Sequence, residues 1–290
     1  MNQTLILGVV ATTLALSAPL LLAALGELIG ERAGVLNIGL EGMMLGGAWG
    51  GAAASFAFHS AAWGVVGAML GGVFLAAIFA LVAIIGRADA IVTGTGLNLL
   101  AIGATGVAHR AMIARFGSYE ATTLPQPIFW MAGAVLVPLL AWMFGATRFG
   151  LQLRAVGEYP VAADAAGVDV VKMRVQSTLM CGALCGLAGA FLSMSHTNSF
   201  AENMTSGRGF IALAIVIFGR WNAWGALGAA LLFGLAEGAQ FFLQGEIATQ
   251  FYPLLLSLPY VLTLVVLSSR KSSLSSNRAP GALGVPYEKS

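Results

Sequence analysis

Long apolar runs separated by short polar stretches make up most of this chain of 290 residues. A helix needs roughly 20 apolar residues to span the hydrocarbon core of a bilayer. Runs of that kind occupy residues 4–25, 39–58, 62–86, 90–113, 126–146, 175–196, 223–244 and 251–269, whereas the apolar run 209–220 is too short to cross comfortably. The pattern therefore predicts an all-α fold, a polytopic transmembrane helix bundle of about 8–10 spans with room for a broken or re-entrant helix.

Composition agrees with a chain whose surface faces a lipid bilayer. Only 9% of its residues are charged and 58% are hydrophobic, whereas about a quarter of the residues of a soluble domain are charged. The net charge is only +2 and no basic stretch is interleaved with aromatic residues, so composition argues against a nucleic-acid partner. Cys181 and Cys185 lie four residues apart on one helix face, where packing is a better interpretation than a disulfide.

The basic residues predict the orientation of the bundle, because Lys and Arg are retained on the cytoplasmic side of a membrane. If the run 209–220 counts as a span, all 14 Lys and Arg residues except Arg110, Arg115 and Arg208 fall on that side. This orientation places the loop 147–174 and the C-terminus in the cytoplasm.

Glycine spacing predicts close helix packing within residues 1–269, which we expect to form one transmembrane domain. Lipid supplies no hydrophobic drive between helices, so their association depends on close approach at small residues. Glycines recur every fourth position at Gly42, Gly46 and Gly50, Gly67 and Gly71, Gly182 and Gly186, and Gly234 and Gly238. Residues 270–290 are rich in Ser, Pro and Gly and are expected to form a disordered cytoplasmic tail.

The absence of a P-loop motif and of metal-site spacing narrows the range of possible functions. A P-loop ATPase needs a lysine directly after a glycine to hold phosphates, but none of the three lysines follows a glycine. The three histidines, His59, His109 and His196, lack the spacing of a metal site. We therefore expect no catalytic residues, no metal and no cofactor in this chain. Any energy source must then lie elsewhere, in a partner protein or an ion gradient.

The first informative polar stretch is residues 26–42, in which Asn37 and Glu41 stand at the start of an apolar run. Ionisable groups inside a membrane are costly and usually face a cavity or a partner. Two interpretations stay open. Either Glu41 lines a pathway, or it lies near the headgroups at an interfacial helix start, where Arg32 could pair with it.

The second stretch is residues 197–210, which are polar and interrupted by glycine and lead into the short apolar run 209–220. This order is typical of a broken or re-entrant helix, whose unpaired backbone needs a wet cavity. An ordinary external loop before a short helix is the alternative.

The third stretch is residues 150–168. Pro160 suits the first turn of a helix and Gly167 the position just past its end, so the sequence predicts a short Ala-rich helix between them. A helix of about two turns is not stable alone and must dock on something. Arg154 and Lys172 could meet acidic groups of a partner, and a simple interhelical linker is the alternative.

These stretches also carry a family resemblance. They read ERAGVLNIGLEGMMLGGA at 31–48, GLQLRAVGEYPVAADAAGVDV at 150–170 and SGRGFIALAIVIFGRWNAWGALGAALLFG at 206–234. Together they resemble the permeases of ribose-type ABC importers, most closely the nucleoside branch called the basic membrane protein family, over nearly the whole chain. The resemblance implies the permease subunit of an importer that moves nucleosides, or a simple sugar, across a bacterial inner membrane by alternating access.

The resemblance also implies partners. It calls for an ABC ATPase subunit that carries Mg-ATP, a second related permease and an external substrate-binding protein that supplies selectivity. Residues 157–167 would be the coupling helix that sits in a cleft of the ATPase, although Tyr159 departs from the asparagine expected before the proline. The residues expected to serve this coupling are Gly157, Glu158, Pro160, Ala162, Ala163, Ala166 and Gly167.

Polar residues and one aromatic residue are the candidates for lining the solute pathway. A nucleoside is neutral, so asparagine side chains suit its sugar hydroxyls and an aromatic ring suits its base. The candidates are Asn37, Glu41, Asn98, Asn198, Phe200 and Arg208.

An ion-coupled secondary transporter of a small polar solute is the main alternative. It would need an intramembrane carboxylate, and Glu41 and Glu237 fall near or inside strong apolar runs. The simpler interpretation of Glu237 is a residue of helix packing or of the membrane interface. A passive channel and an intramembrane enzyme are weaker alternatives.

Overall fold

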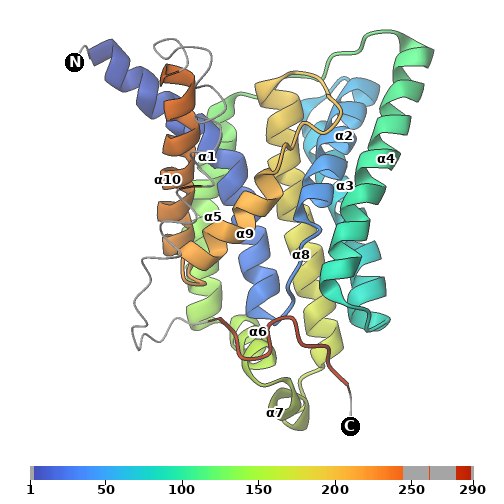
Figure 1. Ribbon diagram of the computed structural model, residues 1–290, viewed down its shortest axis with the longest axis vertical. Coiled ribbons are helices and arrows are strands. Elements are labelled where there is room, and N and C mark those ends of the chain that lie inside the picture. Colours follow the sequence, from blue (N-terminus) through green and yellow to red (C-terminus); the bar gives the residue numbers. More distant parts are fainter. Residues whose placement is uncertain (1–2, 244–260, 262–278, 289–290) are drawn as a thin grey trace.

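Helices and their connections make up the chain over residues 3–243, 261 and 279–288, which are the residues that the computed structural model describes (Figure 1). No β-strand occurs among them. The helices are α1 (Gln3–Arg32), α2 (Leu40–Phe58), α3 (Ala61–Phe79), the π-helical turn η1 (Ala80–Ile85), α4 (Ala90–Phe116), α5 (Gln126–Ala146), α6 (Arg148–Glu158), α7 (Pro160–Ala165), α8 (Val170–Phe191), the π-helical turn η2 (Leu192–His196), α9 (Arg208–Phe218) and α10 (Ala223–Leu243). The predicted all-α bundle is confirmed.

Five helical segments of the described chain are long and apolar enough to cross a membrane. They are Gly8–Arg32, Ala61–Ile85, Ala90–Phe116, Gln126–Ala146 and Val170–His196. Their lengths and composition confirm the polytopic character predicted from the apolar runs. The predicted span 251–269 lies outside the described residues except for residue 261.

The first helix differs from its prediction, because α1 runs on to Arg32 instead of ending near residue 25. Leu28 and Ile29 continue its buried apolar face. Glu27 and Glu31 share the same stretch and are also buried, with 0% and 1% of their surface exposed. The helix therefore carries two carboxyl groups into the protein interior that the apolar pattern alone did not assign to a span.

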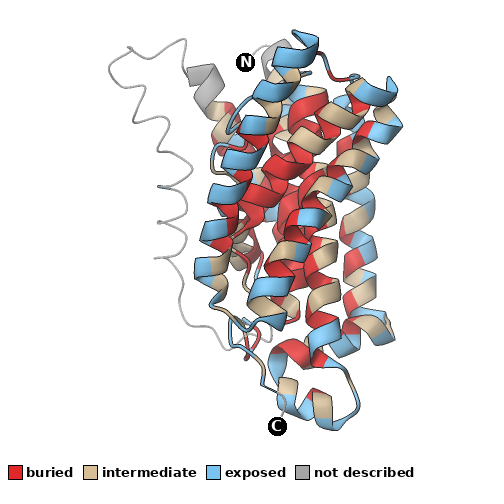
Figure 2. Ribbon diagram, turned by 90° about the vertical axis from the view of Figure 1, so that its right-hand side faces the viewer, coloured by how far each residue is buried: buried red, intermediate tan, exposed pale blue. Residues whose placement is uncertain are grey.

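Burial is distributed as in a membrane protein. The middle of the bundle, which includes most of α1 and α8, is buried, and the outer helices expose large apolar side chains (Figure 2). Phe74 of α3, Leu99 of α4 and Met131 of α5 are each more than 60% exposed, at 66%, 69% and 67%. An apolar surface of this extent on α3, α4 and α5 needs lipid or another protein to cover it.

Close glycine contacts hold α2, α3 and α8 together. A Cβ added at Gly72 of α3 would overlap the backbone of Gly182 and Gly186 in α8, and one added at Gly47 of α2 would overlap Gly186 as well. Helices can approach this closely only where neither carries a side chain. The glycine spacing read from the sequence thus marks the real packing seam of the bundle.

Replacing Gly72 by valine is therefore expected to lower the yield of folded protein severalfold, because overpacking a close contact costs roughly 1–3 kcal/mol. The measurement is the folded fraction in mild detergent by size-exclusion chromatography. Gly103→Val in α4 is the matched control, since no atom lies within 4 Å of a Cβ there. Equal losses in both variants would show that valine in any helix is harmful and that the α3–α8 seam is not special.

Two crossings of the bundle are interrupted. After α1 ends, residues 33–39 are not helical, and α2 begins near the mid-height of the bundle (Figure 1). After η2, the irregular residues 197–207 lead inward, and α9 also begins near mid-height and runs in the opposite direction to α2 (Figure 1). The short helix predicted after the polar stretch 197–210 is thus present as α9, which begins inside the bundle (Figure 1).

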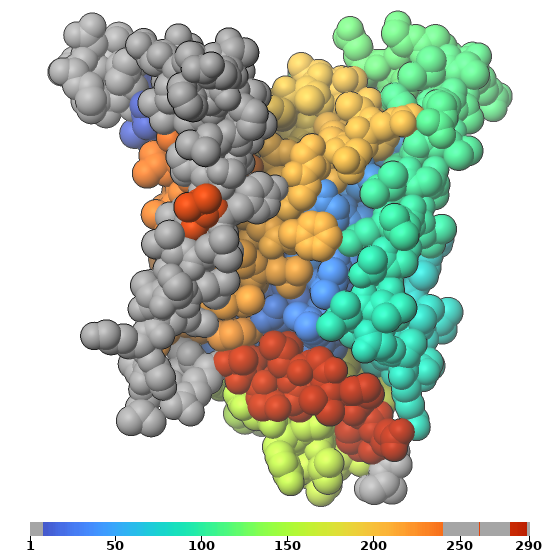
Figure 3. Space-filling view, viewed as in Figure 1, coloured from blue at the N-terminus to red at the C-terminus, as the bar shows by residue number. Residues whose placement is uncertain are grey.

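Of the predicted tail 270–290, the structure describes residues 279–288, and the rest lies outside the described residues. Residues 279–288, here called the C-terminal strip, lie across the end of the bundle that carries α6 and α7, opposite the start of α1 (Figure 3). The Ala282 N–H donates to the Gly157 carbonyl at 2.9 Å, and the Gly284 N–H donates to the Gly34 carbonyl at 3.0 Å. Composition cannot reveal such backbone pairing with distant residues, and it orders the C-terminal strip.

Candidate translocation and coupling sites

Asn37 and Glu27 hold the interruption between α1 and α2. The Glu27 carboxylate accepts the backbone N–H of Asn37 at 3.0 Å. The Asn37 side-chain oxygen accepts the N–H of Gly39 at 2.9 Å, which closes a tight turn before α2. Asn37 is 1% exposed, so this pathway candidate lies inside the protein, where its oxygen serves the turn.

Asn98 ties α4 to the start of α2. Its side-chain oxygen accepts the Gly42 N–H at 2.8 Å, and its side-chain nitrogen donates to the Ile38 carbonyl at 3.0 Å. Both bonds satisfy backbone groups that the interruption leaves without a helical partner. The amide group of this pathway candidate thus has a donor bond and an acceptor bond within the chain.

Glu41 joins the two interrupted crossings. One carboxylate oxygen accepts the Gly207 N–H and the other accepts the Gly209 N–H, each at 2.7 Å. These N–H groups belong to the start of α9, where the helix dipole favours a negative charge. Gly209 packs directly on the Glu41 backbone, since a Cβ there would lie 2.6 Å from the Glu41 Cα. Glu41 therefore clamps the N-terminus of α9 onto that of α2.

The possible pairing of Glu41 with Arg32 is not what the structure shows. Arg32 ends α1, and its Nε donates to the Trp221 carbonyl at 2.9 Å. Arg32 lies at the other side of the interruption, and both Glu41 oxygens are already bonded to α9. Glu41 is 5% exposed, so its side chain is buried in the protein, and its carboxylate is bonded to the start of α9.

Arg208 and Glu237 form a second contact of α9. Arg208 is the first residue of α9, and its Nε lies 3.9 Å from the Glu237 Oε1 on α10. The side chains are 18% and 13% exposed, so the pair is largely buried. The structure thus places Arg208 next to the Glu41 clamp and gives Glu237 a charged neighbour across the bundle.

Asn198 and Phe200 occupy a different place, in the first half of the 197–207 segment. The Asn198 carbonyl accepts the Ala121 N–H at 2.9 Å. Phe200 is 3% exposed and its ring lies 5.1 Å from that of His109. His109 in turn is hydrogen-bonded to Tyr119 at 2.8 Å. The six pathway candidates thus fall into two groups, four near the starts of α2 and α9 and two in this aromatic cluster.

The sequence did not predict the contacts of Trp221 with Glu31 and Arg32 near the end of α1. The Trp221 indole donates to the Glu31 carboxylate, while its carbonyl accepts from Arg32. Arg220 and Trp221 have φ values of 55° and 52°, a left-handed conformation that is strained for side chains of this size. Glu27 and Glu31 are four residues apart just after an apolar run, and this spacing was the available signal that α1 continues.

The short helix predicted between Pro160 and Gly167 is present. In α7, Pro160 is the first residue, and Gly167 follows the helix with a φ of 85° that suits glycine. Seven residues of this region face outward, namely Glu158, Tyr159, Val161, Ala162, Ala165, Ala166 and Gly167. Of the predicted coupling residues, Ala163 and Gly157 instead face inward. Ala163 is 4% exposed, and a Cβ on Gly157 would overlap the Arg32 carbonyl.

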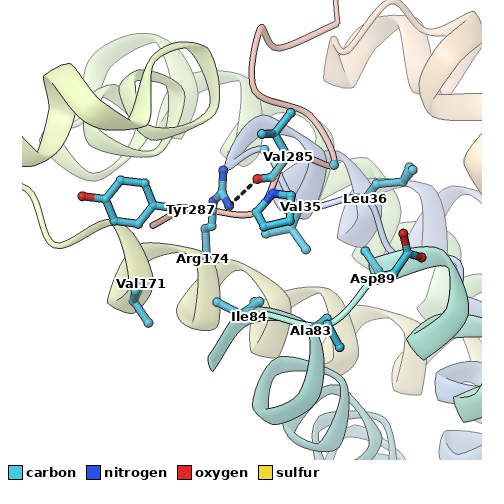
Figure 4. Close-up of a pocket in the computed structure, with 14 residues that line it drawn as sticks. Val35, Leu36, Ala83, Ile84, Asp89, Val171, Arg174, Val285 and Tyr287 are labelled. Atoms are coloured by element: carbon cyan, nitrogen blue, oxygen red, sulfur yellow. Dashed lines mark hydrogen bonds between the residues drawn. The ribbon is translucent and has the colours of Figure 1, made fainter. Parts of the chain in front are cut away.

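The C-terminal strip adds contacts at the same end. Arg174 at the start of α8 is 5% exposed, and its Nη1 donates to the Val285 carbonyl at 2.9 Å (Figure 4). A small cavity of about 70 Å³ lies between the strip and residues 34–36. It is far below the several hundred Å³ of a typical ligand pocket, so we do not assign a solute site to it.

Comparison with known proteins assigns this chain to a protein family. Residues 9–267 match the model of the family described as branched-chain amino acid transport system, permease component. The guanosine ABC transporter permease NupQ of Bacillus subtilis is 35% identical over 97% of this chain and 96% of its own length. The nucleoside ABC transporter permease NupC of Lactococcus lactis is 36% identical over 97% of both chains.

A putative glucose ABC transporter permease of Haloferax volcanii, TsgC13, is 35% identical over 80% of this chain and 77% of its own length. No solved structure gives a significant match. The family match covers residues 9–267 and so includes the interrupted crossings, α6, α7 and the closely packed glycines. The chain therefore belongs to the branched-chain amino acid transport permease family, whose members include ABC transporter permeases.

Proposed function

We propose that this chain is the permease subunit of an ABC importer that carries nucleosides across a bacterial inner membrane. The observation that carries the proposal is the similarity to NupQ and NupC, which extends over 97% of the chain in both cases. The α6–α7 end, together with the C-terminus, faces the cytoplasm in this proposal. The exposed Ala-rich surface of α7 is then available to a cytoplasmic ATPase.

The ATP-driven movement of the ATPase subunit is transmitted to the permease through α7. The ATPase subunit holds the Mg-ATP, because this chain has no P-loop lysine to bind phosphates. The exposed residues of α7 contact the ATPase, and Gly157 passes the displacement on, since its Cα packs against the end of α1 at Arg32 and Gly34. Movement of α1 then reaches the interruption before α2, which Glu41 connects to α9.

Three further partners complete the importer. A second related permease pairs with this chain, and the second copy of the ATPase docks on that permease. A binding protein delivers the solute from outside and supplies most of the selectivity. A sugar is the second candidate for the solute, because TsgC13 is named as a glucose permease and is 35% identical over 80% of this chain.

Affinity purification of the chain from its host membranes in mild detergent tests this proposal. We expect an ATPase, a second permease and a binding protein to co-purify, and the reconstituted complex to take up guanosine only with ATP. Recovery of the chain alone, in a form that transports without ATP, would establish an ion-coupled secondary transporter instead. Uptake of glucose but not guanosine by the complex would establish the sugar importer.

A further inference from the structure

The Arg208–Glu237 pair is an unusual feature of the bundle interior. Buried charges in a membrane protein are costly and are retained where they pair closely or face a wet pathway. The closest atoms of this pair are 3.9 Å apart, so they do not form a hydrogen bond. The pair is therefore held less tightly than a buried ion pair with good geometry.

Both side chains keep unused hydrogen-bonding atoms. Among the described residues, Arg208 Nη1 donates to the Met204 and Thr205 carbonyls, both at 3.4 Å. Arg208 Nε and Glu237 Oε2 are buried and have no hydrogen-bond partner among the residues that the structure describes. Leaving such groups unsatisfied costs roughly 1–3 kcal/mol each, and more for charged groups, so both atoms have hydrogen-bonding capacity that a water molecule or a hydroxyl group can use.

The neighbouring side chains have the same deficit. The hydroxyls of Thr205 and Thr13 are also buried and without a partner in the described part of the chain. Thr205 lies one turn before Arg208, and Thr13 of α1 lies beside Gly238, the residue after Glu237. Glu41, by contrast, has both oxygens bonded at 2.7 Å. Unused polar atoms thus occur at the start of α9, on α10 at Glu237, and on α1 beside Gly238.

The unused atoms define the chemistry of a ligand. A free donor on Arg208 and a free acceptor on Glu237 can be satisfied together by one hydroxyl group, which accepts from Nε–H and donates to Oε2. An anion would be repelled by Glu237 and a cation by Arg208, so a neutral hydroxyl-bearing molecule fits best. We propose that Arg208 and Glu237 form a subsite that binds a ribose hydroxyl of the solute in transit.

This subsite rests on the proposed function and adds Glu237 to it as a solute contact. Its position suits the role, because Arg208 follows Gly207, whose N–H Glu41 holds at the meeting point of the two interrupted crossings. Interrupted helices near the middle of the membrane line the solute sites of many transporters. The proposed subsite lies between the first residue of α9 and α10, next to the interrupted helices.

The test compares guanosine with 2′,3′-dideoxyguanosine, which lacks both ring hydroxyls of the ribose. ATP-driven uptake by the complete reconstituted transporter is measured with saturating, fully loaded binding protein, for the wild type and for the double variant Arg208→Met/Glu237→Met. Replacing a buried ion pair by apolar residues of similar size is usually neutral or stabilising, so this variant is expected to fold. Arg110→Met/Glu202→Met, at an exposed ion pair of 2.8 Å, is the matched control.

We expect the ratio of guanosine to dideoxyguanosine uptake to fall about tenfold in the double variant, because the loss of one charge-assisted hydrogen bond predicts a change of that size. In the control variant the ratio should stay at the wild-type value. The binding protein contributes equally to all three ratios. An unchanged ratio in the double variant would overturn the subsite and leave the pair a packing contact. Failure of the proposed function appears separately, as no ATP-dependent uptake of either nucleoside by the wild type, and it removes the ribose subsite as well.

Discussion

Replacing Ala162 by glutamate is expected to abolish ATP-driven uptake while leaving the amount of permease in the membrane unchanged. Ala162 lies on the exposed side of α7, which we propose to dock in the ATPase. A carboxylate buried there without a partner costs several kcal/mol, which corresponds to a loss on the order of 100-fold or more in docking affinity. Uptake and co-purification of the ATPase are the two measurements.

Ala279→Glu is the matched control for this variant, because Ala279 is an exposed alanine of the C-terminal strip at the same end of the bundle. Its uptake should remain near that of the wild type. Ala163 is the wrong position for this test, since it is 4% exposed and a glutamate there would disturb the packing of α7 itself. Normal uptake and ATPase recovery for Ala162→Glu would remove α7 from the coupling interface.

Replacing Glu41 by alanine is expected to cause the largest loss of stability. The change leaves the N–H groups of Gly207 and Gly209 without their acceptors inside the protein. Two unsatisfied buried donors cost about 2–6 kcal/mol in the free energy of unfolding. We expect a lower unfolding temperature in detergent and little or no uptake, because α9 would no longer be held against α2.

Glu202→Ala is the control for the loss of a carboxylate. Glu202 pairs with Arg110 at 2.8 Å, but the two side chains are 50% and 64% exposed, and exposed ion pairs contribute about 0–1 kcal/mol. Its unfolding temperature should therefore stay close to that of the wild type. If Glu41→Ala also unfolds at the wild-type temperature, the two half-crossings are held by packing alone and the clamp is dispensable.

Local sequence signals predicted much of the fold. The apolar run 126–146 corresponds to α5, and Pro160 with Gly167 marks the limits of α7. These features depend on residues within a few positions of each other, since a helix is defined by its own apolar length and by its caps. The end of α1 was missed for the same reason, because Glu27 and Glu31 look like interfacial charges until distant partners bury them.

The candidate residues were found by residue type, and the structure shows which groups of the chain they contact. Polarity in an apolar context identified Asn37, Glu41 and Asn98, and the structure brings all three to the interruption before α2. Their polar atoms bond mainly to the backbone of the chain itself. A sequence shows that a polar group must find a partner in the membrane, but it does not show whether the partner is a solute or the backbone of another helix.

The sequence by itself determined a polytopic helix bundle, its closely packed glycines, a broken helix after the stretch 197–210 and the short helix after Pro160, because each is encoded by spacing and composition over one or two helices. Only the tertiary structure decided which residues meet across the chain. Glu41 and Gly207 are 166 positions apart, and Arg208 meets Glu237 on another helix. The C-terminal strip lies against Gly34 and Gly157. Contacts of this kind depend on how the helices pack, which no local pattern specifies.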